Sequence, residues 1–247
     1  MDSTILFNAS SLLLLLLIVF SLQAPAKPND GIIRIVTEHL PPYQISRNND
    51  LIGGSVGKEV SELIDIVLPT SKVDVMPWAR AYEIALHQPN TLIFSLVRTP
   101  EREDKFIWIG KVAHVTTRLI SLRDTDIDPV DNLEDLSNIQ IGVKRQDAVA
   151  NFLNQNGFEF ERELVEIVNT ISTMKMLERH RIDAIPANRH IIQYYCKKTG
   201  CETSDFKTIY TFRGLSEEFY LAASLGTDPS IIKQLKEEFA NLKLPID

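Results

Sequence analysis

The sequence is poor in cysteine: its 247 residues contain only Cys196 and Cys201. Four residues separate the two cysteines and no histidine neighbours them, which is not the spacing of a zinc site. A chain of this length can bury a sizeable apolar core, so neither a metal ion nor a set of disulfides is needed for folding. The scarcity of cysteine therefore excludes a small disulfide-rich domain.

Basic clusters and a second long apolar run are also lacking. The net charge is −7 and no extended cluster of lysines and arginines is present, which argues against nucleic acid or an anionic membrane surface as a partner. Beyond the N-terminal region, no apolar run has the roughly 20 residues that cross a bilayer. We therefore expect the rest of the chain to be soluble and not to bind nucleic acid.

The motifs of several enzyme classes are missing as well. The sequence has no Ser–His–Asp order, no His-Glu-x-x-His helix, no Gly-x-Gly-x-x-Gly segment and no pattern of a cysteine nucleophile. The five histidines are scattered, and His180 and His190 are interpreted as surface residues. We therefore predict no catalytic residue, no cofactor and no metal ion.

The N-terminus, in contrast, is strongly apolar. Leu12 to Phe20 is an unbroken apolar run, and Ala24-Pro25-Ala26 follows with the A-x-A spacing of a signal-peptide cleavage site. We predict a signal peptide over residues 1–26 and export to the periplasm. A retained N-terminal anchor is the alternative, because the segment before the apolar run contains Asp2 and no lysine or arginine.

Export bears on the two cysteines. In an oxidising compartment, Cys196 and Cys201 can form a disulfide across the Gly-containing turn between them. We predict such a structural disulfide, and two free thiols are the alternative.

Apolar β-branched runs alternate with amphipathic segments along the rest of the chain. In the first half, strands are expected at 32–37, 72–76 and 91–97, with helices at 54–67 and 78–87. In the second half, strands are expected at 136–143, 164–168 and 182–187. Helices are expected at 147–156, in the segment that contains Met174 and Leu177, and at 190–198. This alternation predicts parallel sheets joined by right-handed crossovers.

The two halves are expected to form separate lobes. The polar, Pro-containing segment 124–132 has the composition of a boundary. A last strand at 218–224 and a helix that begins with Asp228-Pro229 return to the first half. We predict one lobe from residues 27–121 with 223–247 and another from 122–222. Two chain crossings between them would permit a hinge with a cleft.

Six segments, in this order, resemble the family 3 extracellular solute-binding proteins, the periplasmic receptors typified by components of amino-acid ABC transporters. They are IRIVTEHLPPY, LIGGSVGKEVSELI, FSLVRTPERED, NLEDLSNIQIGV, ERHRIDAI and SEEFYLAAS. The resemblance covers essentially the whole chain after residue 26. It implies an α/β fold of two lobes, each a mainly parallel sheet flanked by helices, that close around a ligand. It also implies a monomer that works with a membrane permease.

The stretch from Ser95 to Arg102 has the family's S-x-x-x-T-x-x-R pattern. The resemblance implies that Arg102 clamps a ligand carboxylate, which a planar guanidinium binds bidentately. It also places Ser95 and Thr99 at the cleft. A surface arginine paired with Glu101 or Asp104 is the alternative for Arg102.

Three further residues are candidates for the cleft wall. Tyr43 stands where the family has an aromatic residue, and Trp78 lies near its second one. Glu38 ends the first expected strand, where ligands of open α/β sheets bind. Core packing is the alternative for both aromatic residues.

The second half departs from the pattern of amino-acid receptors. The segment Gly142 to Ala148 lacks their Gly-Thr/Ser turn, and Asp147 is expected to cap the following helix instead. Asn188 stands where those receptors have the acid that binds the ligand ammonium, which puts a free α-amino acid in doubt. A carboxylated or otherwise anionic ligand is favoured if several basic residues face the cleft, and surface charges are the alternative. These residues are Arg80, Arg98, Arg102, Lys144 and Arg145.

The sequence thus predicts a periplasmic protein that captures a small polar solute, carboxylate-bearing and similar to an amino acid, and delivers it to an ABC permease. An enzyme on the same scaffold, a dehydratase or a peptidoglycan lyase, is one alternative, with Glu38 or His39 as the acid or base. A ligand sensor that presents its closed form to a membrane receptor is the other.

Overall fold

The computed structural model describes residues 32–242, so the expected signal peptide at 1–26 lies outside the described residues. Residues 33–242 belong to one compact unit. Within residues 32–242, no helix has the length and apolar character needed to cross a membrane.

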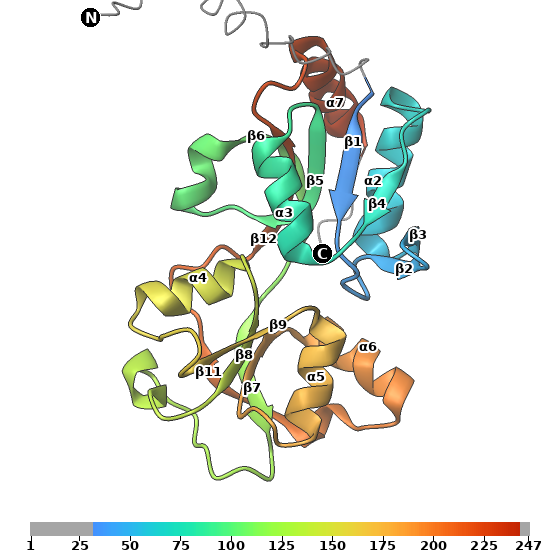
Figure 1. Cartoon of the computed structure of the whole chain (residues 1–247). Helices are drawn as coiled ribbons and strands as arrows, with labels where there is room; N and C mark the ends of the chain where they lie inside the picture. The colour runs from blue at the N-terminus through green and yellow to red at the C-terminus, as the bar shows by residue number, and fades with distance from the viewer. Residues whose placement is uncertain (1–31, 243–247) are drawn as a thin grey trace, which may run out of the picture. The chain divides into compact units, whose positions relative to one another are not determined.

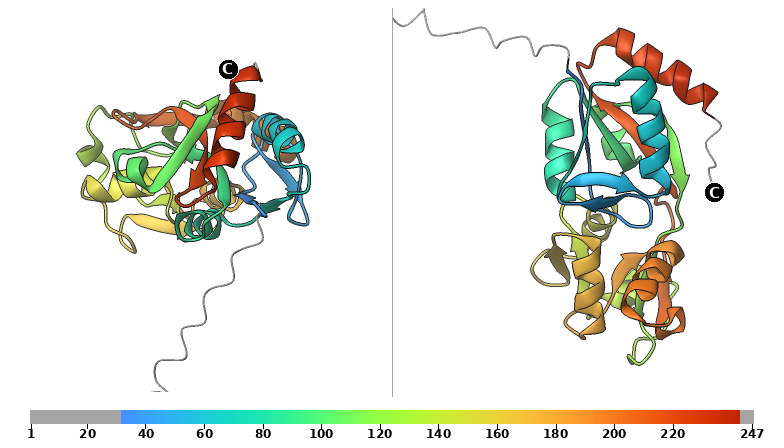
Figure 2. Two further views of the ribbon diagram at one scale, coloured as in Figure 1. Left: turned by 90° about the horizontal axis from the view of Figure 1, so that it is seen from above. Right: turned by 90° about the vertical axis from the view of Figure 1, so that its right-hand side faces the viewer.

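The first lobe is built on a seven-stranded sheet in the order β2-β3-β4-β1-β5-β12-β6 (Figure 1). Its strands are β1 (Arg34–Thr37), β2 (Ile45–Arg47), β3 (Asp50–Gly53), β4 (Val73–Val75), β5 (Thr91–Val97), β6 (Phe106–His114) and β12 (Glu218–Ser224). The central strands β4, β1 and β5 are parallel, and β12 pairs antiparallel with both β5 and β6. The sheet is flanked by α2 (Ser55–Val67), α3 (Trp78–His87) and α7 (Pro229–Asn241), and α7 packs beside α2 (Figure 2).

The second lobe contains two smaller sheets. The antiparallel sheet β10-β7-β11 consists of β7 (Arg118–Leu122), β10 (Ile185–Ala187) and β11 (Phe206–Thr211). The parallel pair consists of β8 (Ile141–Lys144) and β9 (Leu164–Ile167). The helices are α4 (Ala148–Gln155), α5 (Thr170–Glu178) and α6 (Arg189–Thr199). The mixed α/β class is confirmed, with parallel strands at the centre of the first lobe.

Side-chain caps start the helices of the second lobe. Asp147 Oδ1 accepts a hydrogen bond from Val149 N (2.9 Å), as expected, and Asn169 and Asn188 cap α5 and α6 in the same way. Each cap satisfies a backbone N–H that has no partner inside the helix. The caps fix where α4 and α6 begin, and both positions border the first lobe.

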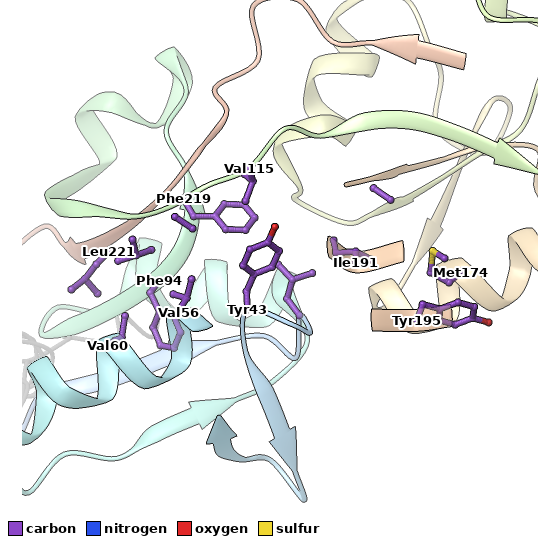
Figure 3. Packing of buried hydrophobic residues seen from close by; sticks show 14 of the residues in the cluster. Tyr43, Val56, Val60, Phe94, Val115, Met174, Ile191, Tyr195, Phe219 and Leu221 are labelled. Atoms are coloured by element: carbon purple, nitrogen blue, oxygen red, sulfur yellow. The ribbon is translucent and has the colours of Figure 1, made fainter. Parts of the chain in front are cut away.

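The chain passes between the lobes twice, once between β6 and β7 and once between β11 and β12 (Figure 1). The sheets place the first passage after His114 and the second after Thr211. The expected lobe boundaries at 121/122 and 222/223 stay a prediction. One cluster of buried apolar side chains includes Tyr43 and Phe219 of the first lobe and Ile191 and Tyr195 of α6 (Figure 3).

Cys196 and Cys201 form a disulfide that links the last turn of α6 to the segment after it. We expect replacement of both cysteines by alanine to lower the free energy of unfolding by about 2 kcal/mol, because a closed loop this short removes little chain entropy from the unfolded state. Urea unfolding of the wild type and the double variant measures the difference. Equal midpoints for the two would contradict this prediction.

Candidate functional site

The carboxyl ends of β1 and β5 lie side by side, because the two strands are parallel neighbours. Glu38 follows β1 directly, and Arg102 follows β5 in a 3-10 helix, η2 (Pro100–Lys105). Ligands of open α/β sheets bind at this edge. The topology thus brings a buried carboxylate and a buried guanidinium, both expected from the sequence, to one edge of the first lobe.

The Arg102 side chain is 2% exposed and lies in the contact between the lobes. Its Nη1 donates to Val97 O of its own lobe (3.0 Å), and Nη2 donates to Gln146 O of the second lobe (2.7 Å). The guanidinium carbon lies 4.8 Å from the ring centroid of Tyr82. Arg102 is therefore not the surface arginine that was the alternative to a ligand clamp.

Glu38 forms the second charged contact between the lobes. Its Oε1 is 2.5 Å from Lys144 Nζ, and Lys144 Nζ is also 3.3 Å from Asp147 Oδ2. Burial raises the pKa of Glu38, although the nearby ammonium of Lys144 opposes this shift. Burial alone would lower the pKa of Lys144, but the charges of Glu38 and Asp147 outweigh it and raise this pKa. The other oxygen, Glu38 Oε2, is buried without a hydrogen-bond partner. One of the two carboxylate oxygens of Glu38 thus lacks the hydrogen bond that buried polar atoms usually make.

The turn between β8 and α4, residues 144–147, supplies the second lobe's side of both contacts. Gln146 has φ 62°, and its carbonyl oxygen accepts from Arg102 and from Trp78 Nε1 (3.1 Å). Lys144 Nζ lies 5.8 Å from the ring centroid of Trp78. Trp78, 3% exposed, therefore lies against the same turn as Arg102 and Glu38.

Ser95 belongs to a buried cluster of polar side chains with Gln44, which was not predicted from the sequence, and Thr37, which directly precedes Glu38. Ser95 has φ 60° in the middle of β5, and its Oγ accepts from Gln44 Nε2. Gln44 Nε2 also donates to Thr37 Oγ1 (3.2 Å), and Gln44 Oε1 is buried without a partner. Its only signal in the sequence is its place directly after Tyr43.

Tyr43 and Asn188 meet across the lobes, as two of the expected site residues. The Tyr43 ring lies parallel to that of His190 (centroids 6.4 Å apart) and edge-on to Phe219 (5.4 Å; Figure 3). Burial raises the pKa of Tyr43 to about 12, against a hydrogen bond with Asn188 that lowers it. Asn188 Oδ1 accepts from Ile191 N (3.1 Å), so the residue that stands in the place of the receptors' acid caps α6.

The remaining basic residues lie elsewhere. Arg80 is exposed on α3, and Arg98 pairs with Glu103 on an exposed face, 5.1 Å from the ring centroid of Trp108. Arg145 is exposed and pairs with Glu166 (2.9 Å). Among the five basic residues considered for the cleft, Arg102 and Lys144 are the two that the structure brings into the contact.

Two hollows border this contact. One, about 330 Å³, is lined by Glu38, His39, Ser46 and Asn49 of the first lobe and by Asn169 and neighbours of the second. The other, about 490 Å³, is lined by residues of η2 and α4, with Thr99, Glu101 and Gln155 among them.

His39 is already engaged in the first hollow. Its Nδ1 accepts from Ser46 N (3.0 Å), and burial lowers its pKa. Within residues 32–242, no three His, Cys, Asp or Glu side chains are grouped so that they could hold a metal ion.

Solved structures share this fold, whereas no family model and no curated protein matches the sequence. Holo ArgBP from T. maritima has a TM-score of 0.70 and 16% identity over 86% of this chain and 91% of its own. A histidine kinase sensor domain with similarity to periplasmic binding proteins has 0.70 and 14% over 85% and 90%. A structure from work on glutathione import via GshT and the cystine ABC importer TcyBC of Streptococcus mutans has 0.68 and 14% over 85% and 88%.

The chain thus has the fold of periplasmic binding proteins, and the resemblance to solute-binding proteins is confirmed at the level of fold. By their descriptions, one of these neighbours is a sensor domain with similarity to periplasmic binding proteins, and another comes from work on an ABC importer.

Proposed function

We propose that this protein captures a small polar, carboxylate-bearing solute similar to an amino acid between its lobes and delivers it to an ABC permease. The observation that supports this most directly is Arg102, a guanidinium that is 2% exposed, aligned by Val97 O, and directed at the second lobe. Arginine suits this role because its planar group binds a carboxylate bidentately.

Binding requires that the lobes part far enough to release Gln146 O from Arg102. A solute carboxylate then takes the place of this carbonyl, and a charged acceptor binds a guanidinium more strongly than a neutral one. Tyr43, Trp78, Ser95 and Thr99 would surround the solute. Because the solute touches both lobes, its affinity for the state with the lobes together sets the shift in population.

The proposal includes export and a monomeric receptor. The apolar segment 12–20 and the A-x-A site at 24–26 support a cleaved signal peptide and a periplasmic location. The similarity to a structure from work on an ABC importer supports a permease as the membrane partner. No chemical change of the solute is part of this function.

A thermal-shift screen tests the proposal. The protein is unfolded and refolded to remove bound solute, and is then heated with a panel of amino acids, dicarboxylates and neutral sugars. A true ligand at a hundred times its Kd should raise the melting temperature by about 5–10 °C. Mass spectrometry should recover that solute unchanged after incubation. Stabilisation by sugars alone, or conversion of the solute, would refute the proposal.

Sensing is a second candidate function, supported by the similarity to a histidine kinase sensor domain. In that case the lobes would bind the same kind of solute, but a membrane receptor and not a permease would recognise the bound form. Uptake of the labelled solute by cells with and without the protein separates the two functions. Unchanged uptake together with a lost transcriptional response would favour sensing.

A further inference from the structure

We infer that the second lobe carries an anion-binding site of its own, in a hollow beside α6 that is separate from the proposed solute site. The hollow has a volume of about 530 Å³ and is lined by residues between Thr116 and Thr208. Two of these residues are arginines, three are threonines and none is acidic. The occupant that fits this lining is a small organic anion with a phosphate or carboxylate group.

The strand register brings basic side chains together at one end of the sheet β10-β7-β11. Arg118 begins β7 and lies opposite Ala187, the last residue of β10, and Arg189 follows two residues later at the start of α6. On its other side, Arg118 lies opposite Thr211, and its Nη1 donates to Thr211 Oγ1 (2.8 Å). This bond aligns the guanidinium and uses one of its five N–H donors, so others remain for an acceptor in the hollow.

The charges of the two arginines are not neutralised by neighbouring acids. Within residues 32–242, neither Arg118 nor Arg189 forms a salt bridge, whereas Arg145, Arg162 and Arg213 each pair with a carboxylate. Two like charges at neighbouring positions repel each other, and a bound anion would relieve this repulsion. Guanidinium groups bind phosphate and carboxylate oxygens through charge-assisted hydrogen bonds. The pair is therefore suited to hold one anionic group.

Acidic side chains of the second lobe gather away from the hollow. Segment 124–135 contains six carboxylates and no lysine or arginine. Figure 1 shows α6 and the 3-10 helix of this segment, Leu133–Leu136, on opposite sides of the lobe. Salt screens charges on the far side of a lobe, because the Debye length is about 10 Å at 0.1 M. The net charge of −7 thus does not prevent an anion from binding beside α6.

The rest of the lining favours an organic anion over an inorganic one. Ile120, Ala187 and Ile192 give the hollow an apolar wall beside its threonine hydroxyls. Its volume of about 530 Å³ is typical of sites for small organic ligands, which are mostly apolar with a few polar groups that fix the orientation. We therefore expect the anionic group at the arginines and the apolar part of the ligand against the isoleucines.

The hollow is built from one lobe and does not require the lobes to be together. Its residues lie on or beside β7, β10, α6 and β11, whereas Arg102 and Glu38 of the proposed solute site belong to the first lobe. Asn188 is the residue common to both sites, since it lines the hollow and forms a hydrogen bond with Tyr43. The anion site should therefore stay formed when the lobes part.

Titration with phenyl phosphate, followed by the amide signals of the protein in NMR spectra, tests the inference. Signals of residues 187–192 and 203–208 should shift at up to about 10 mM probe, a concentration that nearly saturates a site with a Kd of about 1 mM. Arg118→Gln and Arg189→Gln should each weaken binding about tenfold or more, because each removes charge-assisted hydrogen bonds. Arg189 is exposed, so its replacement should leave the melting temperature unchanged and keep the test valid if Arg118→Gln folds poorly.

Arg162→Gln is the matched control, and other probes define the anionic group. The Arg162 side chain is 70% exposed and pairs with Glu159 and Glu163 before β9, so its loss should leave the Kd within about twofold. Phenol, which lacks the charge, should bind at least about tenfold more weakly than phenyl phosphate. Benzoate in parallel separates the two sources of charge: tighter binding of phenyl phosphate indicates a phosphate ester as the natural ligand, and tighter binding of benzoate a carboxylate.

The outcomes distinguish this inference from the proposed function. Absence of shifts at the hollow with both anions, or phenol binding as tightly as phenyl phosphate, would overturn the inference alone. Loss of probe binding in Arg102→Lys, with normal binding in Arg118→Gln and Arg189→Gln, would place the anion at the proposed solute site and also overturn it. Binding at the hollow by a protein that captures no solute in the thermal-shift screen would support this inference and refute the proposed function.

Discussion

Arg102→Lys is expected to weaken solute binding about tenfold to a hundredfold, since the loss of one hydrogen bond to a charged group is worth about 1.5–3 kcal/mol. Lysine keeps the positive charge but lacks the planar fork that lets Arg102 hold Val97 O with one nitrogen and an acceptor from the other side with the second. Calorimetry with the solute found in the screen measures the change in Kd.

Arg98→Lys is the matched control for this prediction. Arg98 lies four residues away in the same stretch, but its side chain is partly exposed and pairs with Glu103. Its replacement should leave the Kd within about twofold, because an exposed ion pair contributes little. Similar losses of affinity in the two variants, or no loss in Arg102→Lys, would show that Arg102 does not bind the carboxylate.

Gly54→Ala is expected to lower the free energy of unfolding by about 3 kcal/mol or more, which is large for a single methyl group. Gly54 has φ 100°, and a Cβ at this position would lie 2.2 Å from Tyr43 O and 2.9 Å from Gln44 Cα. Both are backbone atoms, so the clash cannot be relieved by a side-chain rotation. Urea denaturation measures the loss, and solute affinity should fall with it because Tyr43 and Gln44 border the site.

Gly157→Ala separates the two causes of the destabilisation expected in Gly54→Ala, which are backbone strain and the close approach of the new Cβ to Tyr43 O. Gly157 has a similar φ of 94°, but nothing lies within 4 Å of the Cβ that alanine would add. Only the backbone strain should remain, which costs about 1–2 kcal/mol. If Gly54→Ala and Gly157→Ala destabilise the protein equally, the close approach to Tyr43 O has no energetic consequence.

Sequence periodicity predicted the βαβ part of the fold well. Helix α3 and strand β5 have the expected bounds, and α2 begins one residue later than expected. The two helices show a 3.6-residue apolar period, and β5 is a near-continuous apolar stretch, as expected of a strand in a parallel sheet that is covered on both faces.

Antiparallel strands outside this alternation were not foreseen. Strands β6 and β11 are long and pair with strands distant in the sequence. The hairpin of β2 and β3 is short and partly exposed. The strand expected at 136–143 begins only at Ile141, because the preceding residues include the 3-10 helix Leu133–Leu136. Pairings of this kind depend on tertiary contacts that local periodicity does not encode.

Of the candidate site, only the side chains that charge or aromatic character marks could be predicted from the sequence. Glu38, Trp78 and Arg102 could be named because charge and aromatic character at strand ends are visible in the sequence, and the structure brings them together. The acceptor at Arg102 is a backbone carbonyl of Gln146, which every residue type possesses, so no letter of the sequence marks it. The role of Lys144 depends on a contact between residues 106 positions apart.

The placement of Trp78 gives the protein an intrinsic optical probe. The chain has two tryptophans, and the indole N–H of Trp78 is held by a carbonyl of the opposite lobe, whereas Trp108 packs beside Arg98 within the first lobe. Separation of the lobes would expose one indole to water and leave the other in place. Emission from the Trp108→Phe protein should therefore shift to longer wavelength as the lobes part, so that solute exchange can be timed without any attached dye.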